Sequence, residues 1–381
     1  MIGFALSDEQ QGLRELAHAF ATNEIRPVAW RYDRDSVFPE ELVRKAWELG
    51  LMNAYIPERY GGPGLGALDG ALLDEELAWG CSGVQTTLGC NALAATALLV
   101  AGSEELKRRF LGRLIEAPRL ASFCLSEPGA GSDVAALATR AVRRGDRYVI
   151  SGAKSFVTNG SHADFYVVFA KTDPDAGRAG ISCFVVPRAA GVVLDRHEDK
   201  MGQRASDTAA LSFPEVEVPS DHLVGNENDG FGIAMAALDR TRPGVAAMAV
   251  GVARAAFEFA RDYASERIQF DRPIAAHQAI QFMLADMATE IEAARLLYWR
   301  AACALDGGER ATLLSAHAKR FAADTAMKVT TDAVQVYGGY GYMTDYPVEK
   351  LMRDAKVMQL FEGTSQIQRL VIAREIFAGP A

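Results

Sequence analysis

The spacing of apolar residues divides the chain into three parts. In the first part, apolar side chains recur every three or four residues, as they do within residues 13–20, which predicts amphipathic helices. The middle part contains short β-branched and aromatic runs, such as residues 165–169 and 183–186, bounded by Gly, Asp and Pro, which predicts strands joined by turns. The helical spacing then returns with few prolines, which predicts a helix bundle. The expected boundaries are residues 1–120 for an α-helical N-terminal domain, 121–227 for a β domain and 228–381 for the bundle.

Composition and charge narrow the class of protein. The 381 residues include 40 Lys and Arg against 49 Asp and Glu, and this acidic balance disfavours nucleic acid as a partner, because phosphate binding needs a clustered basic surface. No apolar run has the length of a membrane span, and the start of the chain has the pattern of neither a signal peptide nor a transit peptide. The five cysteines and six histidines show no metal-ligand spacing, so we expect no metal site and reduced thiols. Together these features favour a cytoplasmic protein without a membrane span.

A break in the helical pattern near the C-terminus contains a candidate catalytic residue. Residues 361–366 place a glycine and two hydroxyl residues between two helical stretches, and Thr364 or Ser365 can cap the second helix. Apolar neighbours, Phe361 among them, would raise the pKa of Glu362 and make it a better base once a substrate excludes water. The same pattern fits a solvated acid in the first turn of a helix, so this stretch alone leaves both interpretations open.

Two turns that follow predicted strands have the composition of ligand-binding loops. Residues 126–133 contain two glycines that let backbone N–H groups approach an anion, and Ser132 adds a hydroxyl. Residues 156–160 end a strand with Phe156, a hydroxyl residue and a glycine, which could form the floor for a flat ring. Each pattern alone also fits an ordinary turn, and residues 126–133 lack the glycine fingerprint of dinucleotide-binding folds.

Further candidates lie in the helical C-terminal part. Residues 239–243 place two guanidinium groups directly before Pro243, and a charge cluster at the end of a helix is the plain interpretation. Arg267 joins two helices, where it could bind phosphate or lie on the surface. Residues 337–342 interrupt the helical pattern with glycines and tyrosines, which fits a helix C-cap followed by a turn.

In this order, these stretches resemble the acyl-CoA dehydrogenase family, and most closely its medium- and short-chain branch. The resemblance covers essentially the whole chain, and it is most specific at residues 126–133, 201–204, 267–270, 346–354 and 361–369. It implies an α+β multidomain fold with an all-α N-terminal domain, a middle β-barrel domain and a C-terminal four-helix bundle. It also implies a homotetramer in which FAD lies between the β domain and the bundle and a neighbouring subunit completes the site.

The resemblance also implies roles for individual residues. Glu362 matches the catalytic base. The residues that match contacts to FAD are Leu125, Ser126, Gly131, Ser132, Phe156, Thr158, Thr364 and Gln366. Those that match contacts to the FAD of the partner subunit are Arg267, Phe270, Gln278, Gln335, Gly338 and Gly339. Those that match the acyl-CoA cleft are Ser132, Asp239, Thr241, Arg242 and Gly363.

The reaction implied by the resemblance is the FAD-dependent dehydrogenation of a saturated acyl-CoA to a trans-2-enoyl-CoA in fatty acid β-oxidation. Glu362 would remove the α-proton while a hydride leaves the β-carbon for flavin N5, and an electron-transfer flavoprotein would then reoxidise the flavin. The backbone N–H of Glu362 and a ribityl hydroxyl of FAD would stabilise the developing enolate. Thr241 stands where some relatives carry the base, which favours Glu362. Gly89 is small where one branch has a bulky acid, so we expect a longer acyl chain to fit.

Three alternatives remain open from the sequence. The same fold can act as an acyl-CoA oxidase or a flavin monooxygenase, with oxygen as the acceptor. A decarboxylating dehydrogenase of dicarboxylyl-CoA would want a cation at the far end of the acyl pocket, and residues 85–91 offer none. A nucleic-acid-binding member of the fold, without catalysis, is disfavoured by the acidic balance and by the presence of Glu362.

Overall fold

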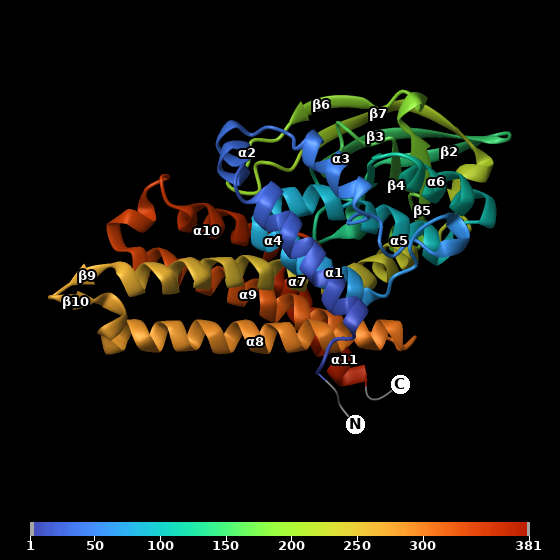
Figure 1. Cartoon of the computed structure of the whole chain (residues 1–381). Coiled ribbons are helices and arrows are strands. Elements are labelled where there is room, and N and C mark those ends of the chain that lie inside the picture. Colours follow the sequence, from blue (N-terminus) through green and yellow to red (C-terminus); the bar gives the residue numbers. More distant parts are fainter. Residues whose placement is uncertain (1–3, 379–381) are drawn as a thin grey trace.

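The computed structural model describes residues 4–378, and its helices and strands follow the predicted order of helix, β and helix (Figure 1). The first part is helical. Its elements are α1 (Asp8–Phe20), a π-helical turn (Ala21–Ile25), α2 (Ala29–Asp35), α3 (Glu40–Glu48), α4 (Ala67–Gly89), α5 (Asn91–Ala101) and α6 (Glu104–Glu116). Ser7 caps α1 by accepting the backbone N–H of Gln10, and the Gln10 side chain accepts the backbone N–H of Ser7 in return.

The middle part forms one sheet of eight strands. They are β1 (Ala121–Cys124), β2 (Arg140–Arg144), β3 (Arg147–Thr158), β4 (Phe165–Lys171), β5 (Ile181–Pro187), β6 (Val193–His197), β7 (Thr208–Pro219) and β8 (Leu223–Val224). The strand order is β6-β7-β3-β2-β4-β5-β8, and β1 pairs with β4 in parallel. Within residues 4–378 the pairing therefore runs as an open path from β6 to β8.

Strand β4 is buried on both faces. Side chains of a strand alternate between its faces. Phe165 and Val167 pack into a core shared with α5, α6 and the start of the bundle, whereas Tyr166 and Val168 pack into a second core among the strands. The uninterrupted apolar run that predicted this strand is therefore explained by two separate cores, one on each face.

The bundle is built on long helices that run side by side. Its elements are α7 (Gly230–Glu266), the short hairpin β9 (Ile268–Gln269) and β10 (Arg272–Pro273), α8 (Gln278–Asp306), α9 (Thr312–Tyr337), α10 (Pro347–Met358) and α11 (Ser365–Ala378). Helices α7, α8 and α9 pack on one another, and α10 and α11 pack on α9 (Figure 1). By length and composition α7 could cross a membrane, but 72% of its most apolar window is buried inside the protein.

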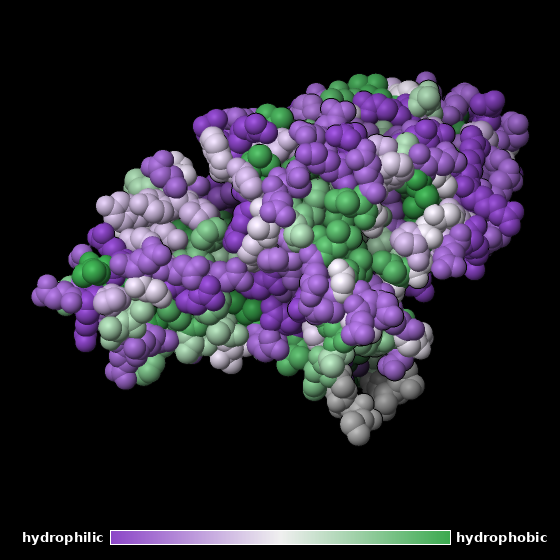
Figure 2. All heavy atoms as spheres, viewed as in Figure 1, coloured by the Kyte–Doolittle hydropathy of each residue, from purple (hydrophilic) through white to green (hydrophobic). Residues whose placement is uncertain are grey.

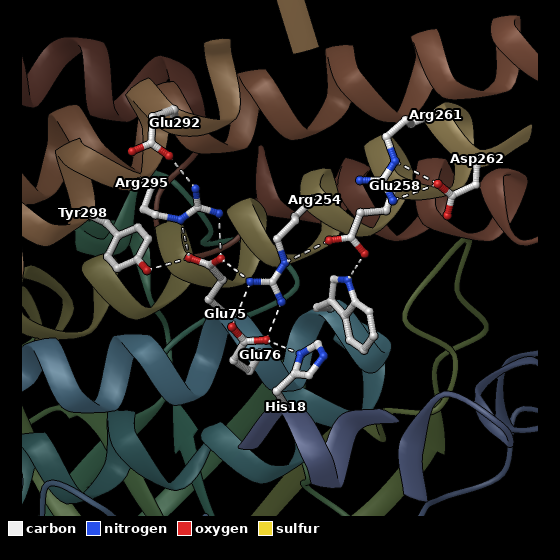
Figure 3. Close-up of polar contacts among 11 residues, drawn as sticks. His18, Glu75, Glu76, Arg254, Glu258, Arg261, Asp262, Glu292, Arg295 and Tyr298 are labelled. Atoms are coloured by element: carbon white, nitrogen blue, oxygen red, sulfur yellow. Dashed lines mark hydrogen bonds and ion pairs between the residues drawn. The ribbon is translucent and has the colours of Figure 1, made fainter. Parts of the chain in front are cut away.

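A buried ion network joins the N-terminal helices to the bundle (Figure 3). Glu75 of α4 accepts hydrogen bonds from Arg254 of α7 and Arg295 of α8, each at 2.8 Å, and from the Tyr298 hydroxyl at 2.6 Å. Burial alone would raise the pKa of Glu75, but the positive charges of Arg295 and Arg254 outweigh it and hold the pKa below its ordinary value. The neighbouring Glu76 also pairs with Arg254, so the two arginines connect both buried carboxylates of α4 to the bundle.

In Figure 2 the surface over the sheet is mostly polar, whereas polar and apolar side chains are mixed over the bundle. Apolar side chains gather on this face between α1 and α5 (Figures 1 and 2). Helix α5 also forms part of the wall of the cavity described below. Helix α5 thus lies beside an apolar part of the surface and also borders the cavity.

Candidate active site

Glu362 lies at the break between α10 and α11, where the backbone takes a left-handed turn. The φ angle is 51° at Glu362 and 88° at Gly363. A positive φ costs a residue with a side chain about 1–2 kcal/mol, so the surrounding structure must hold Glu362 in place. Thr364 closes the turn by accepting the backbone N–H of Ile367 at 3.1 Å, which is the helix cap that the sequence predicted.

Three buried side chains fix the backbone of this turn. Arg242 Nε donates to the Glu362 carbonyl at 3.2 Å, and Lys319 Nζ donates to the Gly363 carbonyl at 2.7 Å. The Gln368 amide reaches both carbonyls, at 3.2 and 3.1 Å. Within residues 4–378, the backbone N–H of Glu362 has no hydrogen-bond acceptor. The turn therefore uses its carbonyls for support and leaves this N–H available to a ligand.

The carboxylate of Glu362 is partly buried and has one hydroxyl donor. Thr241 Oγ1 donates to Glu362 Oε2 over 2.9 Å. Burial raises the pKa of Glu362 above the ordinary value of a glutamate, although the Thr241 hydrogen bond and the charges of Arg242 and Lys319 oppose the change. Burial also lowers the pKa of Lys319 to about 8. A carboxylate with a raised pKa in a partly dry site is suited to accept a proton.

Arg242 is itself held in position by neighbouring residues. Its Nη1 donates to Asp239 Oδ1 at 2.6 Å, and the Thr312 hydroxyl donates to the other oxygen of Asp239 at 2.6 Å. The interpretation of residues 239–243 as a charge cluster at a helix end is wrong, because α7 continues through Pro243 to Glu266. Proline has no N–H to donate to the carbonyl of Asp239, so α7 lacks one backbone hydrogen bond beside the site.

A cavity of about 370 Å³ opens beside Thr241. Its wall is formed by residues 51–55, by parts of α4, α5 and α7, and by the C-terminal end of α8. Gly89 lies in this wall, but the space left by its missing side chain is already filled. The position of a Cβ atom at Gly89 lies 2.8 Å from Gln85 Nε2 and 3.5 Å from Asp74 Oδ1. The small size of Gly89 therefore does not lengthen the cavity.

The β domain presents the residues that match flavin contacts. A bulge in β3 between Lys154 and Val157 leaves Phe156 at a φ angle of 57° with 69% of its surface exposed. Gly131 and Ser132 are exposed in the turn after β1, and a Cβ atom at Gly131 would meet no atom within 4 Å. An exposed aromatic ring beside a hydroxyl and an open glycine backbone fits a flat ring carrying a diphosphate.

Buried contacts hold that turn against β3. The Leu125 carbonyl accepts a hydrogen bond from Lys154 Nζ at 3.1 Å. The Ser126 carbonyl accepts a hydrogen bond from the backbone N–H of Ser155 at 3.0 Å. Lys154 is fully buried and pairs with Glu127 at 2.7 Å. The two segments that match flavin contacts, residues 125–132 and 156–158, are thus fixed relative to each other.

Cys90 connects these segments to Glu362. Its thiol lies 3.8 Å from the Thr158 carbonyl. Burial raises the pKa of Cys90 to about 12, and the nearby charge of Glu362 adds to this change. Thr158 at the end of β3 and Glu362 therefore both lie near this thiol. Gln366, in the first turn of α11, is exposed close to the same break.

The six residues that match contacts to a partner's FAD lie elsewhere. They are at the end of the bundle that carries the β9–β10 hairpin, away from the β domain (Figure 1): Arg267, Phe270, Gln278, Gln335, Gly338 and Gly339. The Arg267 guanidinium lies over the Tyr340 ring at 5.4 Å, and Phe270 is 86% exposed. Within one chain these residues do not meet Glu362, and their role toward a second subunit stays a prediction.

Some functional candidates gave little signal in the sequence. Lys319 is fully buried and supports the turn at Gly363, and it stands on the alanine-rich buried face of α9. A lysine on the apolar face of a predicted helix is the signal that could have found it. Asp74 and Tyr55 line the cavity and were not singled out. Ser132, expected also at the substrate, lies on the exposed turn of the β domain.

Three family models match the chain in order. They describe the N-terminal, middle and C-terminal domains of acyl-CoA dehydrogenase, and they match residues 7–117, 122–216 and 228–377. An acyl-CoA dehydrogenase of Bacillus subtilis (strain 168) is 44% identical over 376 residues, which cover 98% of this chain and 99% of the relative. The matches therefore extend over all three parts of the fold.

Solved structures match over the same extent. Butyryl-CoA dehydrogenase from Megasphaera elsdenii has a TM-score of 0.97 at 42% identity, covering 99% of this chain and 100% of that chain. A chain in a structure of the electron transferring flavoprotein of Acidaminococcus fermentans has a TM-score of 0.96 at 44% identity, covering 98% and 99% of the two chains. The similarity thus includes the arrangement of the helical and β parts around Glu362.

Proposed function

The chain belongs to the acyl-CoA dehydrogenase family, and we propose that Glu362 is the base in its FAD-dependent dehydrogenation of an acyl-CoA to the trans-2-enoyl-CoA. One observation carries the proposal. The carboxylate of Glu362 accepts a hydrogen bond from Thr241, whose side chain lines the cavity, and burial raises its pKa. A proton acceptor is thus held by a residue that lines a cavity of substrate size.

The residues of this chain support proton removal in two ways. The α-proton of a thioester is a weak acid, and it becomes removable when donors stabilise the negative charge that develops on the carbonyl oxygen. The free backbone N–H of Glu362 is such a donor, held by the bonds from Arg242 and Lys319 to the same turn. The Thr241 hydroxyl orients the carboxylate that takes the proton.

FAD would be held by the β domain and by the start of α11. We assign its ring and diphosphate to these residues: Leu125, Ser126, Gly131, Ser132, Phe156, Thr158, Thr364 and Gln366. When bound, FAD supplies the acceptor for the hydride that leaves the β-carbon. The acyl-CoA cleft comprises Thr241, Asp239, Arg242 and Gly363, with Ser132 on the side of the β domain.

We further propose that the chain forms a homotetramer in the cytoplasm. Its support is the group around Arg267 and Phe270, which has flavin-contact chemistry but lies at the far end of the bundle from its own Glu362. Ile268 and Phe270 are 59% and 86% exposed in the single chain, as apolar residues that cover a second subunit would be. An electron-transfer flavoprotein is the proposed acceptor of electrons, and the match to the Acidaminococcus fermentans structure supports it.

Anaerobic titration of the purified protein with saturated acyl-CoAs of increasing length tests the proposal. We expect butyryl-, hexanoyl- or octanoyl-CoA to bleach the visible flavin band, with enoyl-CoA formed in equal amount. If protein that carries FAD is bleached by none of them, the proposed function is wrong. The yield of peroxide under air tests the alternative acceptor, because an oxidase would make one peroxide for each enoyl-CoA.

A further inference from the structure

The cavity beside Glu362 contains a carboxyl group that the proposed reaction does not use. Asp74, on α4, lines the cavity, and its Oδ1 accepts a hydrogen bond from Gln85 Nε2 at 2.7 Å. Among residues 4–378, this is the only hydrogen bond of the Asp74 side chain. The other oxygen, Oδ2, faces Gly244, where a Cβ atom would stand 2.5 Å away. Gly244 is therefore the residue that makes room for this carboxyl group.

Asp74 lies near the proposed base along α7. Gly244 follows Thr241 by three residues on α7, so the two are about 4.5 Å apart along the helix axis. Thr241 holds the proposed base, and both residues line the same cavity. Asp74 thus lies about one helical turn of α7 away from the residue that holds the base, on the wall of the same cavity.

Two further polar atoms near Asp74 have no partner. The Tyr55 hydroxyl is buried in the cavity wall without a hydrogen bond among the described residues. Oε1 of Gln85, which lies behind Asp74 and outside the cavity lining, is buried without a partner as well. Buried polar groups are nearly always paired, and leaving one unpaired is costly. A cavity that binds only hydrocarbon would not place a carboxylate and a phenol in its wall.

The electrostatics agree with a shared environment for these groups. Burial raises the pKa of Asp74 to about 7, the hydrogen bond from Gln85 opposes the change, and the charge of Glu362 adds to it. Burial also raises the pKa of Tyr55, and the charge of Asp74 adds to that change. Asp74 is therefore close enough to both Tyr55 and Glu362 for their charges to interact.

We propose that Asp74 and Tyr55, with Gln85 holding Asp74 in place, form a polar subsite that binds a hydroxyl group on the acyl chain beyond its β-carbon. A hydroxyl can donate to Asp74 Oδ2 and accept from the Tyr55 hydroxyl, so it pairs both. A terminal methyl group would leave both unpaired. A terminal carboxylate would be repelled by Asp74 and Glu362, so the subsite also disfavours the decarboxylating alternative, which wants a cation here.

The test compares acyl-CoAs of equal chain length and rests on the proposed function. The substrates are hexanoyl-CoA, its 4-, 5- and 6-hydroxy derivatives, and adipyl-CoA. For the wild type, we expect kcat/KM to be at least about tenfold higher for one hydroxy isomer than for hexanoyl-CoA, which is the size of one hydrogen bond to a charged group. Adipyl-CoA is expected to be the poorest substrate.

Two variants assign the preference to Asp74. Asp74→Leu is expected to remove the hydroxyl preference while hexanoyl-CoA is oxidised as well as before or better, and the isosteric Asp74→Asn should weaken the preference. Glu309→Gln, at another place in the cavity wall, is the control and should keep the wild-type ratio. FAD content and circular dichroism report whether each variant is folded. If Asp74→Leu does not fold, the conservative Asp74→Asn variant provides the test.

Each result decides the question. If hexanoyl-CoA bleaches the flavin but no hydroxy isomer is preferred, or if Asp74→Asn and Asp74→Leu keep the preference in full, the subsite is wrong and the proposed function stands. If no acyl-CoA of either kind bleaches the flavin, both the function and the subsite are overturned. Loss of the preference in the two Asp74 variants but not in Glu309→Gln supports the subsite.

Discussion

The hydroxyl of Thr241 donates a hydrogen bond to the carboxylate of Glu362 over 2.9 Å, between residues 121 positions apart in the chain. This bond ties α7, which borders the acyl cavity, to the left-handed turn between α10 and α11. It stabilises the charged form of Glu362, whereas burial of the carboxylate favours the neutral form. The pKa of the proposed base is thus set by two opposing effects, and one of them can be removed by a single substitution.

Thr241→Val tests this balance through the pH dependence of kcat/KM. Loss of the hydrogen bond should raise the pKa of Glu362 further. Because the reaction needs the deprotonated carboxylate, the acid limb of the profile should move to higher pH. On the acid side of the profile, we expect kcat/KM to fall about tenfold relative to the wild type. At higher pH, where Glu362 is deprotonated in both proteins, the loss of kcat/KM should be smaller.

Thr331→Val is the matched control for this substitution. Thr331 is exposed on α9, and its hydroxyl donates to the Met327 carbonyl at 2.7 Å. The control should keep the wild-type profile. An acid limb that stays in place in Thr241→Val would contradict the role given to this hydrogen bond.

Gly363→Ala tests the strained turn beside the base. At a φ angle of 88°, a side chain costs about 1–2 kcal/mol, and a Cβ atom would stand 2.7 Å from the Gln368 amide that supports both carbonyls. We expect lower stability and a loss of turnover larger than the loss of FAD. Thermal unfolding and flavin reduction measure the two effects.

Gly12→Ala provides the comparison for the turn. Gly12 lies inside α1, and a Cβ atom there would meet no atom within 4 Å. Alanine is about 1 kcal/mol better than glycine in a helix interior, so this variant should be more stable than the wild type and equally active. Equal behaviour of the two variants would show that the turn has no special conformational demand.

Glu75→Gln tests the joint between the N-terminal helices and the bundle. The substitution leaves Arg254 and Arg295 without their shared carboxylate in a buried place (Figure 3). Removing one partner of a buried ion pair costs about 3–5 kcal/mol, which urea unfolding should detect. The control is Glu292→Gln, because Glu292 pairs with Arg295 but its side chain is 58% exposed, and such a pair contributes below about 1 kcal/mol. Similar losses in the two variants would contradict the account.

The contribution of Glu75 should also depend on pH in a defined direction. Its pKa in the folded protein is lowered below the ordinary value of a glutamate. Its stabilising effect is therefore complete above that ordinary value and is lost as the pH falls through the lowered one. The difference in unfolding free energy between the wild type and Glu75→Gln should shrink in acid, and a difference that stays constant down to the lowest accessible pH would argue against this assignment.

Much of the fold was predictable from the sequence because it depends on local patterns. The helical spacing, the β-branched runs and the hydroxyl cap at Thr364 are properties of neighbouring residues, and the structure has them. Pro243 misled the prediction, because a proline usually ends a helix, but the packing of α7 against α4 and α9 carries the helix through it. Local propensity gave way there to tertiary packing.

The surroundings of Glu362 were less predictable because they are made by distant segments. Lys319 reaches Gly363 from 44 residues away, and Asp74 approaches Gly244 from another helix. The position of Gly89 in the cavity wall was expected from the resemblance, but the filling of its space by Gln85 and Asp74 depends on how α4 packs. No spacing rule along the chain gives contacts of this kind.

The reduction of bound flavin by hexanoyl-CoA in Glu362→Gln, followed anaerobically in a stopped-flow instrument, tests the central claim most directly. General-base catalysis contributes about 10²–10⁴-fold, so bleaching should slow by that factor while FAD content and acyl-CoA binding stay unchanged. Glu105→Gln, an exposed position on α6, should reduce its flavin at the wild-type rate. Bleaching of Glu362→Gln at the wild-type rate would contradict the assignment of Glu362 as the base.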